Sequence, residues 1–379
     1  MSEFALDENG RISDSDPVYD KLDKWHDSDD FDSIIGTVLA VPREEWSNKL
    51  HFRLISAYNN KKDYESAAKE LEEIRGSCES PRDLAKFYYM NGYIYFMTDR
   101  EMLALSMYRQ GLEADPENTS GLDLDTECRE CLEYINEDLN ALYLSCADAA
   151  AKIAARCREN PDKIDVSDND FTIQLGFLFA IRILPGMTHG LKLGDFFQKF
   201  EGEERQAVLK FLSGRFGITD RASLLESISK DRYCNLGIMV NDAMARLAGK
   251  PSFDPEILDR AGREAFENCT LFVRAFSEFL PRAGVLAWDI HEKMGMARYA
   301  YSCGLLPEDD YTAAMMALTD IAKERFSSAE EYLRSLVFGC AMYAFDVDCW
   351  NIGGATEFMK KMLAFLLHSD LPDMEWKKK

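Results

Sequence analysis

Apolar side chains recur along most of the chain at intervals of three and four residues, which is the spacing of one face of an α-helix. In one central segment this spacing joins Ile290, Met294, Ala297 and Tyr301. Gly304 follows directly, at a position where helices commonly end. No segment alternates apolar and polar residues convincingly enough for a β-strand. The pattern therefore predicts an all-α protein.

Three stretches in the first part of the chain share the same apolar offsets, which indicates an internal repeat. The steps between copies are 33 and 37 residues. Such a period is typical of antiparallel helix pairs whose apolar faces are covered only by the neighbouring pair. Small residues at Ala67 and Ala104 would let two helices approach closely. The aligned positions are Trp25, Tyr58 and Tyr95; Ile34, Ala67 and Ala104; and Val38, Leu71 and Tyr108.

Taken together, these copies resemble tetratricopeptide repeats over about residues 17–145. The third copy matches best, through Gly92, Tyr95, Ala104, Tyr108 and Pro116. The resemblance implies a helical solenoid. From about residue 200 the helical spacing continues without the repeat, which predicts a separate C-terminal helical domain. The expected organisation is a flexible acidic N-terminus at 1–16, repeats at 17–145, connecting and capping helices at 146–203, and a helical domain at 204–379.

In tetratricopeptide proteins, the first helices of successive repeats line a groove that holds an extended peptide or a helix of a partner. Carried over by resemblance, the groove residues here are Tyr19, His26, Phe52, Ser56, Asn59, Tyr89, Tyr93 and Phe96. Some members bind a C-terminal carboxylate with Lys and Asn side chains. This chain does not have those residues at the corresponding positions, so a chain terminus is not the expected ligand. The alternative is that these side chains pack against the following domain of the same chain.

Local signals predict where helices of the second half begin. Thr219 is a predicted N-cap, and Pro307 precedes three acidic residues that suit the start of a helix dipole. Ser328 and Glu331 have the spacing of a capping box.

Four segments of the second half carry a second resemblance. They are FGITDRASLLESI at 216–228, AWDIHEKMGMARYAYSCGLLPEDDY at 287–311, RFSSAEEYLRSLVFGCAMY at 325–343 and LPDMEW at 371–376. Over about residues 204–376 the chain resembles a bacterial family known as domain of unknown function 1266. Trp288, Asp289 and Gly304 match positions common in that family, whereas Ala329 stands where a tryptophan is common. The resemblance implies no reaction.

The net charge of −23 lies mostly in the first part of the chain. Residues 1–160 hold 34 acidic and 18 basic side chains, a balance of −16, and residues 161–379 hold 33 and 26, a balance of −7. Such a surface repels phosphate groups, which excludes nucleic acid and anionic membranes as expected partners. The expected partner is a protein or peptide, with a preference for a basic one.

The ten cysteines lack the spacing of a disulfide framework, and the first residues lack the features of a secretory signal. We therefore expect reduced thiols and a cytoplasmic protein. The apolar run at 171–186 is too short for a membrane span and contains Gln174 and Arg182, so a core helix is expected there. The sequence predicts no cofactor and no metal site.

The stretch AWDIHEKMGMARY at 287–299 holds the weak catalytic candidates Asp289, Glu292 and Arg298. Asp289 and Glu292 lie one helical turn apart and could act as an acid and base pair, but Lys293 follows Asp289 at a spacing that favours a surface ion pair. His291 and Glu292 begin the H-E-x-x-H zinc motif, in which Gly295 replaces the second histidine.

Periodicity assigns the residues of this helix to faces. The core face holds Ile290, Met294, Ala297 and Tyr301. His291 is expected to point away from this face. A second packing face holds Trp288, Glu292, Gly295 and Tyr299.

These observations favour a non-catalytic protein-binding protein of a bacterial cytoplasm that acts through the repeat groove. Two alternatives stay open. One is a hydrolase-type enzyme that uses the carboxylates of the 287–299 helix. The other is an immunity-type inhibitor, in which an acidic repeat protein neutralises a basic toxin.

Overall fold

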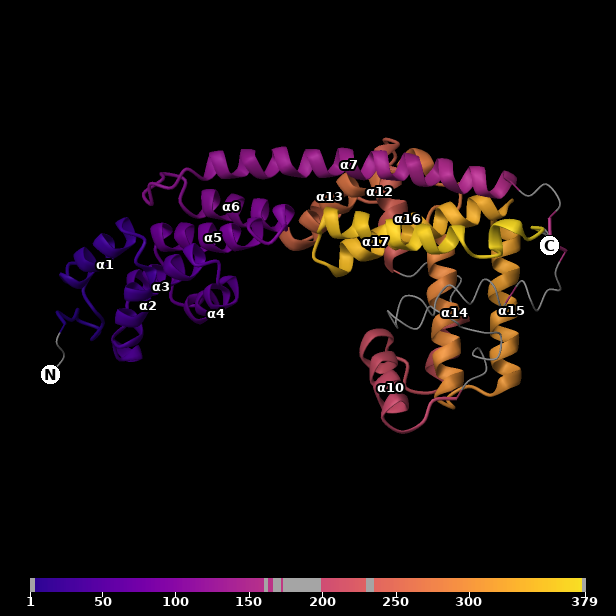
Figure 1. Ribbon diagram of the computed structural model, residues 1–379, viewed down its shortest axis with the longest axis horizontal. Coiled ribbons are helices and arrows are strands. Elements are labelled where there is room, and N and C mark those ends of the chain that lie inside the picture. Colours follow the sequence, from indigo (N-terminus) through magenta and orange to yellow (C-terminus); the bar gives the residue numbers. More distant parts are fainter. Residues whose placement is uncertain (1–3, 160–162, 166–171, 173–198, 230–234, 377–379) are drawn as a thin grey trace. The chain divides into compact units, whose positions relative to one another are not determined.

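The computed structural model describes residues 4–159, 163–165, 172, 199–229 and 235–376 (Figure 1). These residues form helices, and the bridges among them are two isolated ones, Leu6 with Ile12 and Ile164 with Met374. The all-α prediction is confirmed. In this part of the chain no helix has both the length and the apolar character needed to cross a membrane. Apart from Thr172, the apolar run at 171–186 lies outside the described residues.

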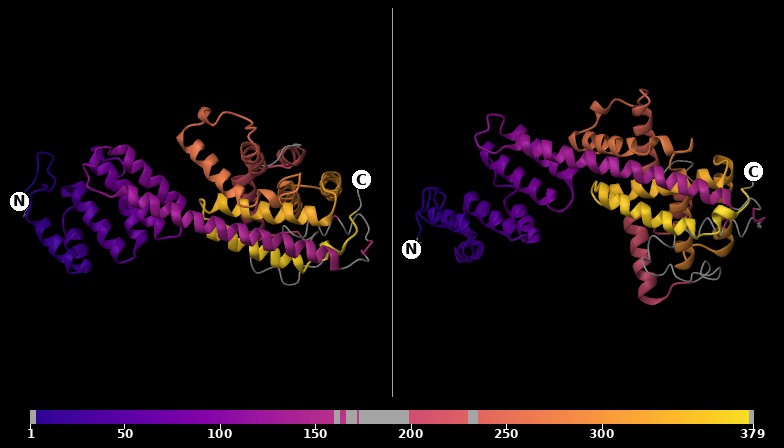
Figure 2. Two further views of the ribbon diagram at one scale, coloured as in Figure 1. Left: turned by 90° about the horizontal axis from the view of Figure 1, so that it is seen from above. Right: turned by 45° about the horizontal axis from the view of Figure 1, so that its top comes forward.

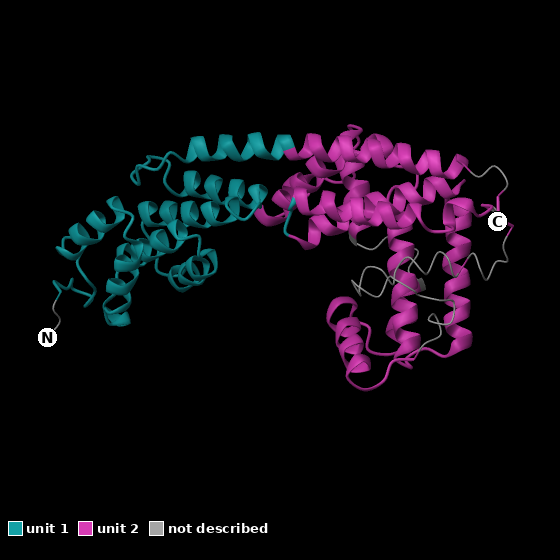
Figure 3. Cartoon of the chain, viewed as in Figure 1, with its two compact units in different colours: residues 1–137, 349–351 teal, residues 138–348, 352–379 magenta. Residues whose placement is uncertain are grey.

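The chain divides into two compact units (Figure 3). Unit 1 is Met1–Glu137 with Cys349–Asn351, and unit 2 is Asp138–Asp348 with Ile352–Lys379. The division falls inside one continuous helix, α7 (Leu124–Glu159). The sequence placed the end of the repeats at residue 145, within the same helix.

Unit 1 is built from consecutive helix pairs joined by short turns (Figure 1 and Figure 2). α1 packs on α2, α3 on α4 and α5 on α6, and contacts of α2 with α3 and of α4 with α5 join the pairs. Asp30, Ser47, Asp63 and Ser80 cap four of these helices by accepting a hydrogen bond from the backbone three residues on. The bounds are α1 (Val18–Asp27), α2 (Phe31–Leu39), η1 (Arg43–Glu45), α3 (Asn48–Asn60), α4 (Tyr64–Ile74), α5 (Pro81–Phe96) and α6 (Glu101–Ala114).

Small residues permit the close contacts between these helices. Ala67 and Ala104 are fully buried, as their place in the repeat predicts. A Cβ atom at Gly92 would lie 2.4 Å from Cε1 of Tyr108, so only glycine lets this ring rest on α5. Tyr108 itself is completely buried.

The N-terminal segment differs from the flexible tail that the sequence predicts for residues 1–16. Ile12 is 1% exposed, and its N–H donates to the carbonyl of Glu45 at 2.7 Å. The Asp16 carboxylate accepts hydrogen bonds from the N–H groups of Ala5 (2.7 Å) and Val18 (2.8 Å). Residues 4–16 therefore fold back on unit 1, because Ile12 can be buried in its core.

In unit 2, one central helix, α14, is surrounded by other helices. α14 packs against α10, α11, α12, α15 and α16. Stacked rings of Phe272 and Phe345, with centroids 4.0 Å apart, join α13 to α16. The bounds are α10 (Gly202–Phe216), α11 (Arg221–Ser229), α12 (Asn235–Leu247), η3 (Pro255–Ile257), α13 (Arg260–Arg274), η4 (Ser277–Phe279), α14 (Leu286–Ser302), α15 (Glu308–Arg325), α16 (Ala329–Val347), α17 (Ile352–Leu367) and η5 (Leu371–Asp373).

Most of the predicted helix ends in unit 2 are confirmed. Gly304 has a positive φ of 76° just after α14, and the Ser328 hydroxyl accepts the N–H of Glu331 at 3.2 Å. Pro307 precedes α15, whose first turn is acidic. At α11 the prediction was one residue off: the carboxylate of Asp220, rather than Thr219, accepts the N–H of Ser223 at 2.8 Å. A carboxylate beside a helix start is favoured by the helix dipole.

The last residues of unit 2 are bound to the end of α7. Arg156 donates two hydrogen bonds to the Asp373 carboxylate, at 2.6 and 2.5 Å. Ile164 donates to the carbonyl of Asp373 at 2.8 Å, and Glu375 donates to the carbonyl of Ile164 at 3.0 Å. The C-terminal segment is thereby fixed to residues more than 200 positions earlier.

Candidate functional site

Three of the predicted groove residues lie in the interior of unit 1, so their assignment to a groove was wrong. Tyr19 is 2% exposed and packs with residues of α2, α3 and the N-terminal segment. Its hydroxyl lies 2.7 Å from the Ser47 hydroxyl, and burial raises the pKa of Tyr19 to about 12. Phe52 and Asn59 are 5% and 7% exposed. The repeat offsets correctly place these residues on helices. Which side chains of a helix are buried depends on the neighbouring helices and segments that pack against it.

The other five predicted groove residues are partly exposed. His26 of α1 and Ser56 of α3 approach each other, with Nε2 and Oγ 3.5 Å apart. On α5, Tyr89, Tyr93 and Phe96 follow one another at intervals of four and three residues, so they share one face.

The aromatic face of α5 continues onto α7. The rings of Phe96 and Tyr134 meet edge to face with centroids 5.3 Å apart, and Tyr134 is 51% exposed. We call Tyr89, Tyr93, Phe96 and Tyr134 the aromatic surface. The sequence assigned Tyr134 only to a capping helix, because nothing in the local pattern shows which residues of α7 lie beside α5.

A carboxylate lies beside this surface. Glu127, in the first turn of α7, is partly buried, and burial together with the negative charge of Glu130 raises its pKa. Burial also raises the pKa values of Tyr89 and Tyr93, and the charge of Glu127 adds to both shifts. The carboxylate therefore lies within electrostatic reach of both phenols.

The catalytic candidates of α14 are in the interior of unit 2. Asp289, Glu292 and Arg298 are 1%, 5% and 6% exposed. The predicted surface ion pair of Asp289 with Lys293 is wrong in its placement, since Lys293 is only 8% exposed. The prediction that His291 points away from the core is also wrong, since His291 is fully buried. Helices pack on α14 from all sides, so it has no solvent face.

Buried charges of this kind occur both in interior ion-pair networks and in catalytic sites. The described part of the chain holds no group of three His, Cys, Asp or Glu side chains that could bind a metal ion. A pocket at α16 and α17 is lined by none of the three candidates. Its lining residues are Tyr343, Ala344, Val347, Asp348, Gly354 and Phe358. A catalytic role for Asp289, Glu292 and Arg298 stays a prediction.

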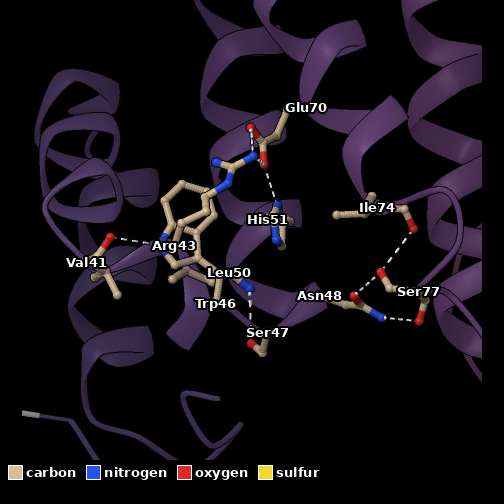
Figure 4. Close-up of polar contacts among 10 residues, drawn as sticks. All are labelled: Val41, Arg43, Trp46, Ser47, Asn48, Leu50, His51, Glu70, Ile74 and Ser77. Atoms are coloured by element: carbon tan, nitrogen blue, oxygen red, sulfur yellow. Dashed lines mark hydrogen bonds and ion pairs between the residues drawn. The ribbon is translucent and has the colours of Figure 1, made fainter. Parts of the chain in front are cut away.

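A polar cluster that the sequence did not reveal joins α3 to α4 (Figure 4). Arg43 and His51 are both directed at the Glu70 carboxylate, and the Arg43–Glu70 distance is 3.0 Å. The Arg43 guanidinium also lies 4.1 Å from the Trp46 ring centroid. Burial acts to raise the pKa of Glu70, but the hydrogen bonds and charges of His51 and Arg43 outweigh it, and the pKa is lowered.

This cluster makes the stability of unit 1 dependent on pH. A carboxyl group with a lowered folded-state pKa stabilises above its unfolded pKa, and this contribution disappears as the pH falls through the folded value. We expect Glu70→Gln to lower the free energy of unfolding by about 1.5–3 kcal/mol at pH 7, the range for hydrogen bonds to charged groups. The difference from the parent should shrink below about pH 4.5.

Urea unfolding followed by circular dichroism across this pH range tests the expectation. Glu73→Gln, at an exposed position of the same helix, is the matched control and should have little effect. A Glu70→Gln difference that stays constant from pH 7 to pH 3 would contradict a role for the Glu70 charge.

Comparison with known proteins bears on the C-terminal part of the chain. No curated protein and no solved structure matches the chain. No family match covers the N-terminal helix pairs. Residues 211–377, which include α11–α17, match the family described as "Protein of unknown function (DUF1266)", and this supports a domain of that family in the C-terminal part of the chain.

Proposed function

We propose that this chain is a non-catalytic protein-binding protein of a bacterial cytoplasm. In this proposal, unit 1 is a tetratricopeptide-like module that binds an extended segment of another protein against the aromatic surface. The observation that carries the proposal is the run of partly exposed rings from Tyr89 to Tyr134 across α5 and α7.

Rings in this arrangement suit protein recognition. Tyrosine and phenylalanine offer large, rigid contact areas with few rotatable bonds, and aromatic residues dominate the binding energy of many interfaces. The stacked helix pairs α1–α2, α3–α4 and α5–α6 support a repeat module, since such modules bind along the first helix of each pair. His26 and Ser56 would extend the contact onto α1 and α3.

The charge of the N-terminal part favours a basic partner. Its balance of −16 attracts positively charged segments over a distance set by the ionic strength. Screening shortens from about 10 Å at 0.1 M salt to about 3 Å at 1 M, so binding to a basic segment should weaken as salt is added.

The proposal is tested by selecting from a library of random linear twelve-residue peptides displayed on phage against the full chain. We expect peptides that bind the parent and lose about tenfold or more in affinity with Phe96→Ala or Tyr134→Ala, since this corresponds to about 1.4 kcal/mol for an interface aromatic residue. Fluorescence anisotropy of the labelled synthetic peptides gives the affinities at 50 and 500 mM salt.

Tyr143→Ala is the matched control, because Tyr143 is a 41% exposed ring of α7 outside the aromatic surface. It should leave the affinity unchanged. The proposal fails if the selection yields no peptide that binds, or if the bound peptides are insensitive to Phe96→Ala and Tyr134→Ala.

A further inference from the structure

The N-terminal segment of unit 1 is attached to the helices by few of its residues. We call residues 4–16 the strap and Ile12 its anchor. The anchor is 1% exposed, whereas most other side chains of the strap are exposed. Its N–H donates to the Glu45 carbonyl at 2.7 Å. Two residues later, the Asp14 carbonyl accepts a hydrogen bond from the Lys49 ammonium group at 2.7 Å. The attachment thus centres on one buried aliphatic side chain and two hydrogen bonds.

The strap keeps its shape through hydrogen bonds within itself. The Asp7 carboxylate accepts the N–H groups of Asn9 and Arg11, each at 2.9 Å. At the base of the strap, the Asp16 carboxylate accepts the N–H of Ala5 at 2.7 Å. These bonds do not involve the helices of unit 1, so they persist when the anchor leaves its place.

The groups beneath the anchor are held by contacts of their own. Tyr19 and Trp46 belong to the same hydrophobic cluster as the anchor. The Tyr19 hydroxyl lies 2.7 Å from that of Ser47, and the Lys49 ammonium lies 3.9 Å from the Tyr19 ring centroid. The Trp46 indole N–H donates to the Val41 carbonyl at 3.0 Å (Figure 4). The site is therefore built from residues that other parts of unit 1 hold in position, and such preorganisation favours binding.

The strap covers part of the core of unit 1, and a permanent cover would do the same. A segment with that role alone gains stability by burying more of its apolar side chains. Leu6 is instead 40% exposed, and Phe4 is only partly buried. The strap is thus bound in the way a short peptide is bound, through one anchor residue in a pocket of larger side chains.

We propose that the strap is a displaceable internal ligand, and that the place it occupies binds an extended segment of another protein. This segment carries an aliphatic residue in the position of Ile12 and, two residues later, a backbone carbonyl that accepts from Lys49. The strap joins α1 at Pro17, so its effective concentration at the site is about millimolar, and a free segment must compete with it. The site shares no residue with the aromatic surface and does not depend on the proposed function.

Hydrogen exchange on the full chain tests whether the strap opens by itself. Resolved by NMR, the Ile12 N–H should exchange about tenfold or more faster than those of Leu54 and Ile55 in α3, because the strap can leave without unfolding that helix. Equal protection of the three amides would show that the strap opens only when unit 1 unfolds, and would overturn the proposal.

Binding is tested with a synthetic peptide of residues 4–16 as the probe, titrated into the ¹⁵N-labelled full chain. The Ile12→Ser chain, whose own strap is poorly anchored, should bind this peptide about tenfold or more tightly than the parent does, since the parent's strap competes for the site. A peptide that itself carries Ile12→Ser should lose this binding. Leu6→Ser in the chain is the matched control, because Leu6 is an exposed residue of the strap, and it should leave the parent's affinity unchanged.

Two further variants, both made in the Ile12→Ser chain, locate the bound peptide. Lys49→Met should weaken the peptide about threefold or more, because it removes one hydrogen bond. Phe96→Ala should have no effect. A loss of binding with Phe96→Ala would place the peptide on the aromatic surface and would overturn this site.

Circular dichroism melts show whether each variant is folded, and if Ile12→Ser does not fold, the exchange measurement on the parent decides. Equal binding of the probe to the parent and to Ile12→Ser, or binding to neither, would overturn the proposal. A parent that is a dimer by light scattering, and a monomer with Ile12→Ser, would also overturn it, because the strap would then occupy the site of a second copy. Each of these results leaves the proposed function, which is tested at Phe96 and Tyr134, unaffected.

Discussion

Replacing Trp288 by Ala is expected to lower the free energy of unfolding by about 3–5 kcal/mol, the cost of removing a large aromatic side chain from a packed core. Trp288 is completely buried, and its ring lies 5.2 Å from that of Tyr343. A Cβ atom at Gly339 of α16 would come within 2.4 Å of the Trp288 Cβ. The tryptophan thus occupies space that α16 leaves open, and a rigid helix cannot move in to fill the cavity.

Urea unfolding followed by circular dichroism measures the loss, and hydrogen exchange at the amides of α14 and α16 shows whether it lies in unit 2. Trp288→Phe, which leaves a smaller cavity, should cost less than Trp288→Ala. A Trp288→Ala protein as stable as its parent would contradict the packing described for this helix.

The second large effect is expected at His291, where Ala should cost about 2–4 kcal/mol, the range for removing a medium-sized buried side chain. The sequence pattern alone placed this residue off the core face and would have given it a cost well under 1 kcal/mol. The structure buries it completely, with its ring 5.6 Å from that of Trp288.

His368→Ala is the matched control, because His368 is an exposed histidine in the same unit and should change stability by less than about 0.5 kcal/mol. The same urea unfolding experiment compares the two variants. Equal stability of His291→Ala and His368→Ala would show that burial at position 291 contributes nothing to the fold.

The behaviour of α14 shows how far a periodic pattern can be taken. The spacing of Ile290, Met294, Ala297 and Tyr301 correctly predicted a helix and its core face. A second packing face was expected at Trp288, and only the side that holds Asp289 and Lys293 was expected to lie near water. A pattern of residue types shows which side is most apolar, but it does not show how many helices pack around the element. That number depends on tertiary contacts with α10, α11, α12, α15 and α16.

The repeat region shows a different limit. Ala67 and Ala104 were correctly predicted as positions of close helix contact. They are equivalent positions of the repeat, and equivalent positions have the same packing in successive helix pairs. Tyr19 was misplaced because Ile12, from outside the repeat, joins it in one core. Glu127 and Tyr134 were missed because their importance depends on which side of α7 faces α5. Side chains brought together by the packing of separate helices leave no spacing that a single sequence can reveal.

The contact between Arg156 and Asp373 has a consequence for the order in which unit 2 can form. Synthesis runs from the N-terminus, so the last turns of α7 leave the ribosome long before residues 371–375 exist. Until then the Arg156 guanidinium and the backbone of Ile164 lack the groups that bind them in the finished protein. Contacts so distant in sequence form slowly, because a long loop must close first. The final turn of α7 is therefore one of the last parts of the chain to reach its native surroundings.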